Sequence, residues 1–185
     1  MADKEKNVQP LRTSAEIDEM KWALRRFCSE RDRFLFSFGI NTGLRVSDIV
    51  PLTVGDVRNK THVIKREKKT GKARRFYLNQ ALRADIDAYI SGLDDAEYLF
   101  PSRKGNAHIS TTQAYRTLVK AAEMLGRDDV GSHTMRKSFG YHYYKRTKDV
   151  AALQTLFNHS APSITLKYIG ITDEEIEASL EDFSL

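Results

Sequence analysis

Residues 132–168 have the sequence SHTMRKSFGYHYYKRTKDVAALQTLFNHSAPSITLKY, and this stretch decides how the fold is interpreted. Ser132 is a favoured N-cap residue, which predicts that His133 and Arg136 lie in the first turn of a helix. Side chains three residues apart on a helix share a face, with Cβ atoms about 5–6 Å apart. Because a helix start also presents free N–H groups and a positive partial charge, the sequence predicts an anion site, most simply for a phosphate.

The rest of this stretch predicts two more helices. After a helix over residues 133–147, Asp149 is placed to cap a second one, which ends at Asn158 because asparagine tolerates the left-handed conformation. His159 follows that stop directly. Ser163 is placed to cap a short helix that contains Tyr168. The stretch therefore offers a histidine, an arginine, a second histidine and a tyrosine at the ends of helices.

Outside this stretch, apolar residues at helical spacing predict a mainly helical domain with one small sheet. Thr13 to Glu16 has the spacing of a capping box, and Gly43 is placed to end the second helix. Helices are predicted over about 17–27, 30–41, 45–50, 81–92, 110–125 and 174–180. The fold class is thus mainly α (α+β), with residues 13–185 as one domain and residues 1–12 as a tail or linker remnant.

A second arginine, Arg45, stands far upstream in Thr42-Gly43-Leu44-Arg45-Val46-Ser47-Asp48. Asp48 lies three residues later, on the same predicted helix face. Spacing alone favours a surface ion pair between the two, worth less than about 1 kcal/mol. The alternative is an arginine aimed at a ligand, with Asp48 fixing the orientation of its guanidinium from behind.

Residues 62–67 and 72–78 are rich in strand-forming side chains and predict a hairpin that turns near Lys69-Thr70-Gly71. One acid, Glu67, stands among seven basic residues between positions 65 and 75. These are Lys65, Arg66, Lys68, Lys69, Lys72, Arg74 and Arg75. Charge on an exposed edge strand resists aggregation, but seven like charges repel strongly, which favours a polyanion partner. Lys69 at the tip is placed to swing onto a bound phosphate.

Composition excludes several other kinds of protein. The 185 residues carry 30 basic and 25 acidic side chains, a net charge of +5, which permits nucleic-acid binding without proving it. The single cysteine, Cys28, rules out an internal disulfide and fits a reducing, cytoplasmic setting. No apolar run approaches the roughly 20 residues of a membrane span. Adjacent acid pairs at 94–95 and 128–129 diverge, so no metal site is expected, nor any other cofactor.

Taken together, these motifs resemble those of the tyrosine recombinase, or phage integrase, family, in the family's order and over residues 13–182. The motifs are Thr42-Gly43-Leu44-Arg45-Val46-Ser47-Asp48, Lys69-Thr70-Gly71, His133-Thr134-Met135-Arg136, Phe157-Asn158-His159-Ser160 and Tyr168. The family commonly has glutamate at position 48, leucine at 135 and glycine at 158, and none of these departures removes a reactive group. Family members usually carry an N-terminal helical domain, whereas only about twelve residues precede the first helix here.

The resemblance implies roles for the residues of these motifs. Arg45 and Arg136 bind the oxygens of a DNA phosphodiester, with Asp48 behind them, and Tyr168 attacks it to form a 3′-phosphotyrosine. His133 accepts or orients the proton, His159 contacts the phosphate or the tyrosine, and Lys69 protonates the leaving 5′ oxygen. Neither metal nor ATP is required. The expected partner is double-stranded DNA, with a monomer when free and a tetramer on DNA.

Two other functions share parts of this pattern. A type IB topoisomerase has the same nucleophile and arginine cluster but relaxes DNA alone. A non-catalytic DNA-binding module would keep the basic hairpin and lack a catalytic residue, yet none is missing. The C-terminal segment Thr172 to Leu185 favours a recombinase, because in the family such a helix often packs on a neighbouring subunit, but here it can equally well pack on its own core.

Overall fold

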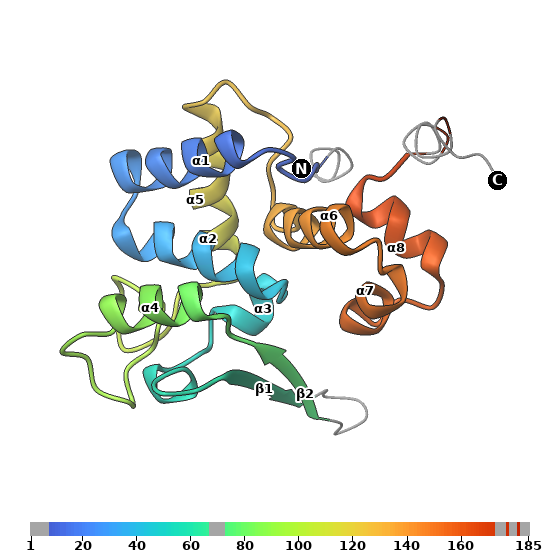
Figure 1. Ribbon diagram of the computed structural model, residues 1–185. Coiled ribbons are helices and arrows are strands. Elements are labelled where there is room, and N and C mark those ends of the chain that lie inside the picture. The colour runs from blue at the N-terminus through green and yellow to red at the C-terminus, as the bar shows by residue number, and fades with distance from the viewer. Residues whose placement is uncertain (1–7, 67–72, 173–176, 178–180, 182–185) are drawn as a thin grey trace.

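The computed structural model describes residues 8–66 and 73–172, together with residues 177 and 181 (Figure 1). The elements are α1 (Ser14–Phe27), α2 (Glu30–Thr42), α3 (Val46–Ile49), η2 (Val54–Asp56), β1 (His62–Arg66), β2 (Ala73–Tyr77), α4 (Gln80–Tyr89), α5 (Thr111–Glu123), α6 (Thr134–Thr147), α7 (Val150–Phe157) and α8 (Pro162–Ile169). The prediction of a mainly helical fold with one small antiparallel sheet is confirmed. The predicted helix at 174–180 lies almost wholly outside the described residues.

The larger hydrophobic core lies between α1, α2, α4 and α5. Its centre is aromatic, because Phe34, Phe36 and Phe38 of α2 are completely buried and Phe34 stacks on Tyr89 at 4.1 Å between ring centroids. The bulky side chains on several sides of α2 explain why this helix is buried almost throughout, as the sequence predicted. This core holds α2 and α3 rigidly, and therefore fixes the backbone around Arg45.

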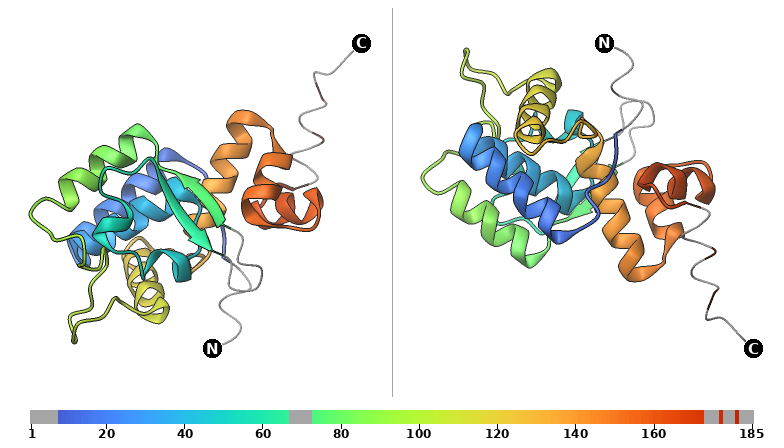
Figure 2. Two further views of the ribbon diagram at one scale, coloured as in Figure 1. Left: turned by 90° about the horizontal axis from the view of Figure 1, so that it is seen from below. Right: turned by 90° about the horizontal axis from the view of Figure 1, so that it is seen from above.

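A smaller core joins the second half of α6 to α7 and α8. Leu153, Phe157 and Ile169 are completely buried in it, and Tyr141 is nearly so. Figures 1 and 2 show α6 between the larger helical group and the pair formed by α7 and α8, which lies on the far side of α6 in each view. The two parts of the predicted active site thus rest on different cores, with α6 as the bridge.

Several helix ends follow the predicted local signals. Thr13 and Glu16 form the predicted capping box of α1. Gly43 ends α2 in the left-handed conformation, and Asn158 does the same for α7 with φ 56° and ψ 46°. These two left-handed residues turn the chain just before Arg45 and just before His159. Both turns are therefore part of how the site is positioned.

Two predicted N-caps are wrong. The N-cap of α6 is His133, not Ser132, and the N-cap of α8 is Ala161, with Pro162 in the first turn, not Ser163. At α6, the hydroxyl of Thr134 accepts a hydrogen bond from the N–H of Gly131 and the N–H of Thr134 donates to the carbonyl of Gly131. This turn closes without Ser132 as the cap, and the fixed φ of proline suits the start of α8.

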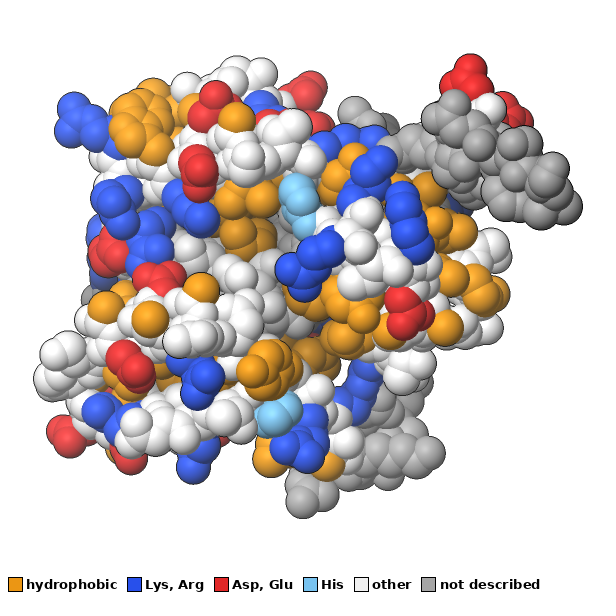
Figure 3. Space-filling view, viewed as in Figure 1, with side chains coloured by type: hydrophobic (Ala, Val, Ile, Leu, Met, Phe, Trp, Pro, Cys, Tyr) orange, Lys and Arg blue, Asp and Glu red, His pale blue; other side chains and the backbone are white. Residues whose placement is uncertain are grey.

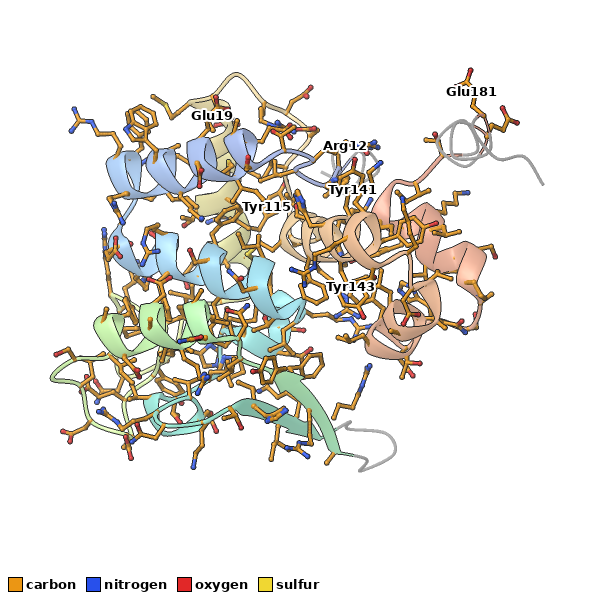
Figure 4. All side chains as sticks on the ribbon, in the orientation of Figure 1. Arg12, Glu19, Tyr115, Tyr141, Tyr143 and Glu181 are labelled. Atoms are coloured by element: carbon orange, nitrogen blue, oxygen red, sulfur yellow. The ribbon has the colours of Figure 1, made fainter. Side chains whose placement is uncertain are left out.

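Residues 8–12 pack against α6, which differs from the tail or linker expected for residues 1–12. Leu11 is completely buried, its N–H donates to the hydroxyl of Ser138, and its carbonyl contacts the His142 ring. Arg12 donates to the carbonyl of Gly170 at 2.7 Å and lies over the ring of Tyr141, as Figure 4 illustrates. We call residues 8–12 the N-terminal strap, because they join α6 to the end of α8.

Gly140 allows α6 to approach the smaller core closely. A Cβ atom at this position would lie 2.5 Å from Cγ2 of Ile169 and 2.8 Å from the ring of Phe157. Gly140→Ala is therefore expected to lower the free energy of unfolding by about 1–3 kcal/mol through overpacking, less the roughly 1 kcal/mol that alanine gains in a helix. Urea denaturation measures the change, with exposed Arg146→Ala as a near-neutral control. An unfolding free energy above that of the wild type would contradict this packing.

Among the described residues, no helix has the length and apolar character needed to cross a membrane.

Candidate active site

Arg136 lies in the first turn of α6 and joins three separate segments. Its side chain is among the few buried charged ones, at 4% exposure. The guanidinium donates to the carbonyl of Gly43 after α2 and, at 3.1 Å, to the carbonyl of Phe157 at the end of α7. It also lies over the Phe157 ring, 4.1 Å from the centroid. Burial lowers the pKa of Arg136 to about 10, so the group remains a cation at neutral pH.

Arg45 reaches the same place from the N-cap position of α3. Its side chain is exposed, and it lines a pocket of about 180 Å³ together with Arg136 and His133. The other lining residues are Val46, Ser47, Thr111 and Ser132. Two arginines that are far apart in the sequence therefore converge on one small pocket. Because one is exposed and the other buried, the exposed Arg45 is available to a ligand while Arg136 forms the floor.

Tyr168, on α8, is half-buried beside the pocket. Its hydroxyl lies 3.1 Å from Nδ1 of His133, and its ring packs edge-on against Phe157 at 5.6 Å between centroids. Burial raises the pKa of Tyr168, and the positive charges of Arg136 and Arg45, with a side-chain hydrogen bond from Arg136, oppose this in part. The phenol is therefore protonated at neutral pH, with a histidine nitrogen and a cation beside its oxygen.

His159 occupies the loop between α7 and α8, directly after the left-handed Asn158. Nδ1 of its ring lies 3.1 Å from the hydroxyl of Thr165, and its ring centroid is 5.1 Å from that of Tyr168. Partial burial and the charges of Arg136 and Arg45 lower the pKa of His159. The imidazole is therefore neutral at physiological pH, with one N–H to donate.

Asp48 is half-buried on α3, and its negative charge raises the pKa of Arg136. The carboxylate thus acts on the buried Arg136, whereas both interpretations drawn from the sequence paired Asp48 with Arg45. A carboxylate at this position helps to keep a cation in a poorly solvated place.

Comparison with known proteins identifies this arrangement. A sequence model described as "Phage integrase family" matches residues 13–175, a span that includes Arg45, His133, Arg136, His159 and Tyr168. The chain belongs to the phage integrase family. The resemblance drawn from the motifs is thereby confirmed.

Relatives within the phage integrase family differ in length. The chain is 47% identical over 176 residues to the probable integrase/recombinase YoeC of Bacillus subtilis, across 95% of this chain and 97% of that protein. It is 31% identical to the tyrosine recombinase XerC of Herpetosiphon aurantiacus, across 78% of this chain and 49% of that protein. The chain thus spans almost the full length of one relative and about half of the other.

Solved structures share the fold of this phage integrase family member. The crystal structure of XerA recombinase matches with a TM-score of 0.75 at 19% identity, over 94% of this chain and 63% of that one. A post-cleavage complex of the XerH site-specific recombinase with a palindromic difH substrate matches with a TM-score of 0.69 at 18% identity, over 95% and 53%. At these identities the likeness concerns the fold.

The hairpin is only partly described. β1 and β2 pair antiparallel with Ile64 opposite Arg75 and Lys65 opposite Arg74, close to the predicted strands. Three lysines predicted to act at the phosphate or on DNA, and the side chain of one arginine, lie outside the described residues. They are Lys68, Lys69, Lys72 and Arg66. The roles of these four side chains therefore stay predictions.

Arg74 and Thr165 are the residues whose contacts the sequence did not reveal. Arg74, grouped with the DNA-binding residues from its charge, donates to the carbonyls of Thr155 and Leu156 at 2.7 and 2.6 Å. It thereby ties the hairpin to the last turn of α7, next to His159. Thr165 stands three residues before Tyr168, a spacing that placed it near the nucleophile, but nothing in the sequence paired it with a histidine from the preceding loop.

Among residues 8–66 and 73–172, with 177 and 181, no group of three or more His, Cys, Asp or Glu side chains is arranged to hold a metal ion.

Proposed function

We propose that this chain, a tyrosine site-specific recombinase, cleaves a DNA strand by attack of Tyr168 on a phosphodiester held by Arg45 and Arg136. The observation that carries the proposal is the phenol oxygen of Tyr168 lying 3.1 Å from Nδ1 of His133, at the pocket lined by both arginines. A phosphodiester is an anion, and two guanidinium groups can bind its non-bridging oxygens with a geometry that lysine does not reproduce.

The proton balance assigns the remaining roles. Because the pKa of Tyr168 is raised, its proton must leave as the bond to phosphorus forms, and we assign Nδ1 of His133, 3.1 Å from the phenol oxygen, as the acceptor. The 3′ phosphate becomes attached to the tyrosine, and the bond to the 5′ oxygen breaks. We assign the protonation of that oxygen to Lys69, as the family resemblance implies. A 5′ hydroxyl then reverses the step, so the phosphodiester energy is conserved and no ATP is used.

The direct experiment uses a DNA duplex with a nick close to the cleavage site, so that a short fragment diffuses away after cleavage. The expected result is a protein–DNA adduct on a denaturing gel, with the 3′ phosphate found on Tyr168 by peptide mass spectrometry. Cleavage that leaves a free 3′ or 5′ phosphate and no adduct would contradict the proposal. Relaxation of supercoiled plasmid without paired sites would indicate a topoisomerase-type activity instead.

Assembly on DNA is a further part of the proposal. We expect a monomer in the absence of DNA and a tetramer on paired sites, as the resemblance implies. Light scattering with and without DNA measures the mass of each species. A tetramer in the absence of DNA, or a monomer that completes strand exchange, would contradict this assembly.

DNA binding by the hairpin is expected to depend on individual side chains. Figure 3 shows both basic and acidic side chains on one face of the molecule. Arg75→Gln should reduce the slope of log Kd against log salt by about 1, because Arg75 is exposed, has only His62 as a side-chain contact, at 3.3 Å, and can reach one phosphate. Arg74→Gln should leave that slope unchanged, because the Arg74 guanidinium donates to the carbonyls of α7.

Fluorescence anisotropy over a range of salt concentrations measures both slopes. The two variants are matched controls for each other, since both remove one positive charge from β2. A reduced slope for Arg74→Gln with no change for Arg75→Gln would reverse the assignment.

A further inference from the structure

Thr165 is a polar side chain that the mechanism above does not use, although it is completely buried. It stands on α8, one turn before Tyr168, and its hydroxyl lies 3.1 Å from Nδ1 of His159. Within the helix, its hydroxyl also lies 3.4 Å from the carbonyl of Ala161. The hydroxyl has one hydrogen, so either it donates to an unprotonated Nδ1, or it donates to the carbonyl and a protonated Nδ1 donates to it.

The distances and the chemistry favour the histidine as the acceptor. The contact with Nδ1 is the shorter one, and the carbonyl of Ala161 already accepts the backbone N–H of Thr165 at 3.3 Å. When a hydroxyl donates to Nδ1 of a neutral imidazole, the single ring proton resides on Nε2. The ring then presents an N–H on its far side from Thr165.

The backbone of His159 is held just as closely as its ring. Its N–H donates to the carbonyl of Gln154 at 3.1 Å, and its carbonyl accepts a bond from the Gln154 side-chain amide at 3.2 Å. The ring lies edge-on to Phe157 and Tyr168. These bonds hold the backbone of His159 and leave its side-chain dihedrals χ1 and χ2 free to rotate. The hydrogen bond to Thr165 fixes the orientation of the ring.

We propose that Thr165 is a positioning residue that holds His159 as the Nε2–H tautomer, so that this N–H donates to the phosphate that Tyr168 attacks. The proposal rests on the proposed function of the site. Because Thr165 and Tyr168 share α8, a shift of this helix moves the nucleophile and the phosphate donor together. The geometry of attack then does not depend on two separately moving groups.

The test compares Thr165→Val, which keeps the shape and removes the hydroxyl, with Thr165→Ser, which restores the hydroxyl. Thr155→Val is the matched control, because exposed Thr155 on α7 likewise has its hydroxyl near the carbonyl four residues earlier, at 3.0 Å from that of Ala151, but has no histidine partner. We expect Thr165→Val to slow adduct formation at least about tenfold, less than the 10²–10³-fold typical of removing a charge-stabilising donor itself. Affinity for DNA should change less than twofold, and Thr165→Ser should recover most of the rate.

Nitrogen-15 NMR of the histidine rings in the free protein determines the direction of the hydrogen bond between Thr165 and His159, whether or not the chain cleaves DNA. The wild type should show His159 as the Nε2–H tautomer, and Thr165→Val should raise its pKa, since a donor to Nδ1 stabilises the neutral ring. The charged and titratable groups that act on this ring are Arg136 of α6, Arg45 at α3 and Tyr168 of α8. They are unchanged in these variants.

Three outcomes would overturn the proposal. An Nδ1–H tautomer in the wild type, or a pKa of His159 that falls in Thr165→Val, would make the hydroxyl an acceptor. Wild-type rates in Thr165→Val would show that the hydroxyl does not position the ring. Absence of any adduct in the wild type would refute the proposed function, while the tautomer would still report on Thr165.

Discussion

Tyr168→Phe is expected to reduce formation of the covalent protein–DNA adduct by on the order of 10⁴-fold or more, since the attacking oxygen is removed. The fold should be retained, because phenylalanine keeps the ring contacts with Phe157 and His159. The phenol loses its contact with exposed His133, which water can replace, and its hydrogen bond from the side chain of Arg136. Binding of intact DNA should therefore remain close to that of the wild type.

Single-turnover cleavage of the nicked duplex, followed by a denaturing gel, measures the loss of adduct. Tyr143→Phe is the matched control, because Tyr143 is a half-buried tyrosine of α6 that stacks on Phe139 and lines a separate hollow with Asn41. It should react at the wild-type rate. An adduct that persists in Tyr168→Phe would move the nucleophile to another residue.

Arg136→Lys and Arg45→Lys are expected to slow cleavage to a similar degree but to differ in stability. Each loses a guanidinium beside the phosphate, which we expect to cost about 10²–10³-fold in rate. Arg136 also bridges the carbonyls of Gly43 and Phe157, and one ammonium group cannot reproduce both bonds. Leaving a buried carbonyl unpaired costs about 1–3 kcal/mol, so Arg136→Lys should unfold at a lower temperature.

Thermal denaturation and single-turnover kinetics on the same two variants separate these effects. Arg45 is exposed, so Arg45→Lys should have the melting temperature of the wild type and serves as the control for stability. Equal melting temperatures for both variants would contradict the bridging role of Arg136. A wild-type cleavage rate in Arg45→Lys would remove that residue from the site.

Local sequence signals predicted the helices well where one residue decides the backbone. Gly43 and Asn158 end helices in the left-handed conformation, as expected for the residue types that tolerate it. Ser132 failed as a cap because the turn before α6 closes instead through Thr134 and Gly131. A cap preference is weak where a neighbouring hydroxyl can make a competing bond.

The candidate site was predicted from the motif order, whereas its support was not. The sequence identified Arg45, Arg136 and Tyr168, and the structure brings them together. Contacts such as that from Arg74 to the end of α7 join a side chain to a backbone carbonyl of another element. Every residue has a carbonyl, so such a bond leaves no pattern in the sequence, and only the fold shows which carbonyl is reached.

The N-terminal strap has a mechanical consequence. Lys137 of α6 donates to the carbonyl of Val8, and four residues later Arg12 holds the last turn of the helix that carries Tyr168. A displacement of Val8 is therefore transmitted through the five residues of the strap to the helix that carries the nucleophile.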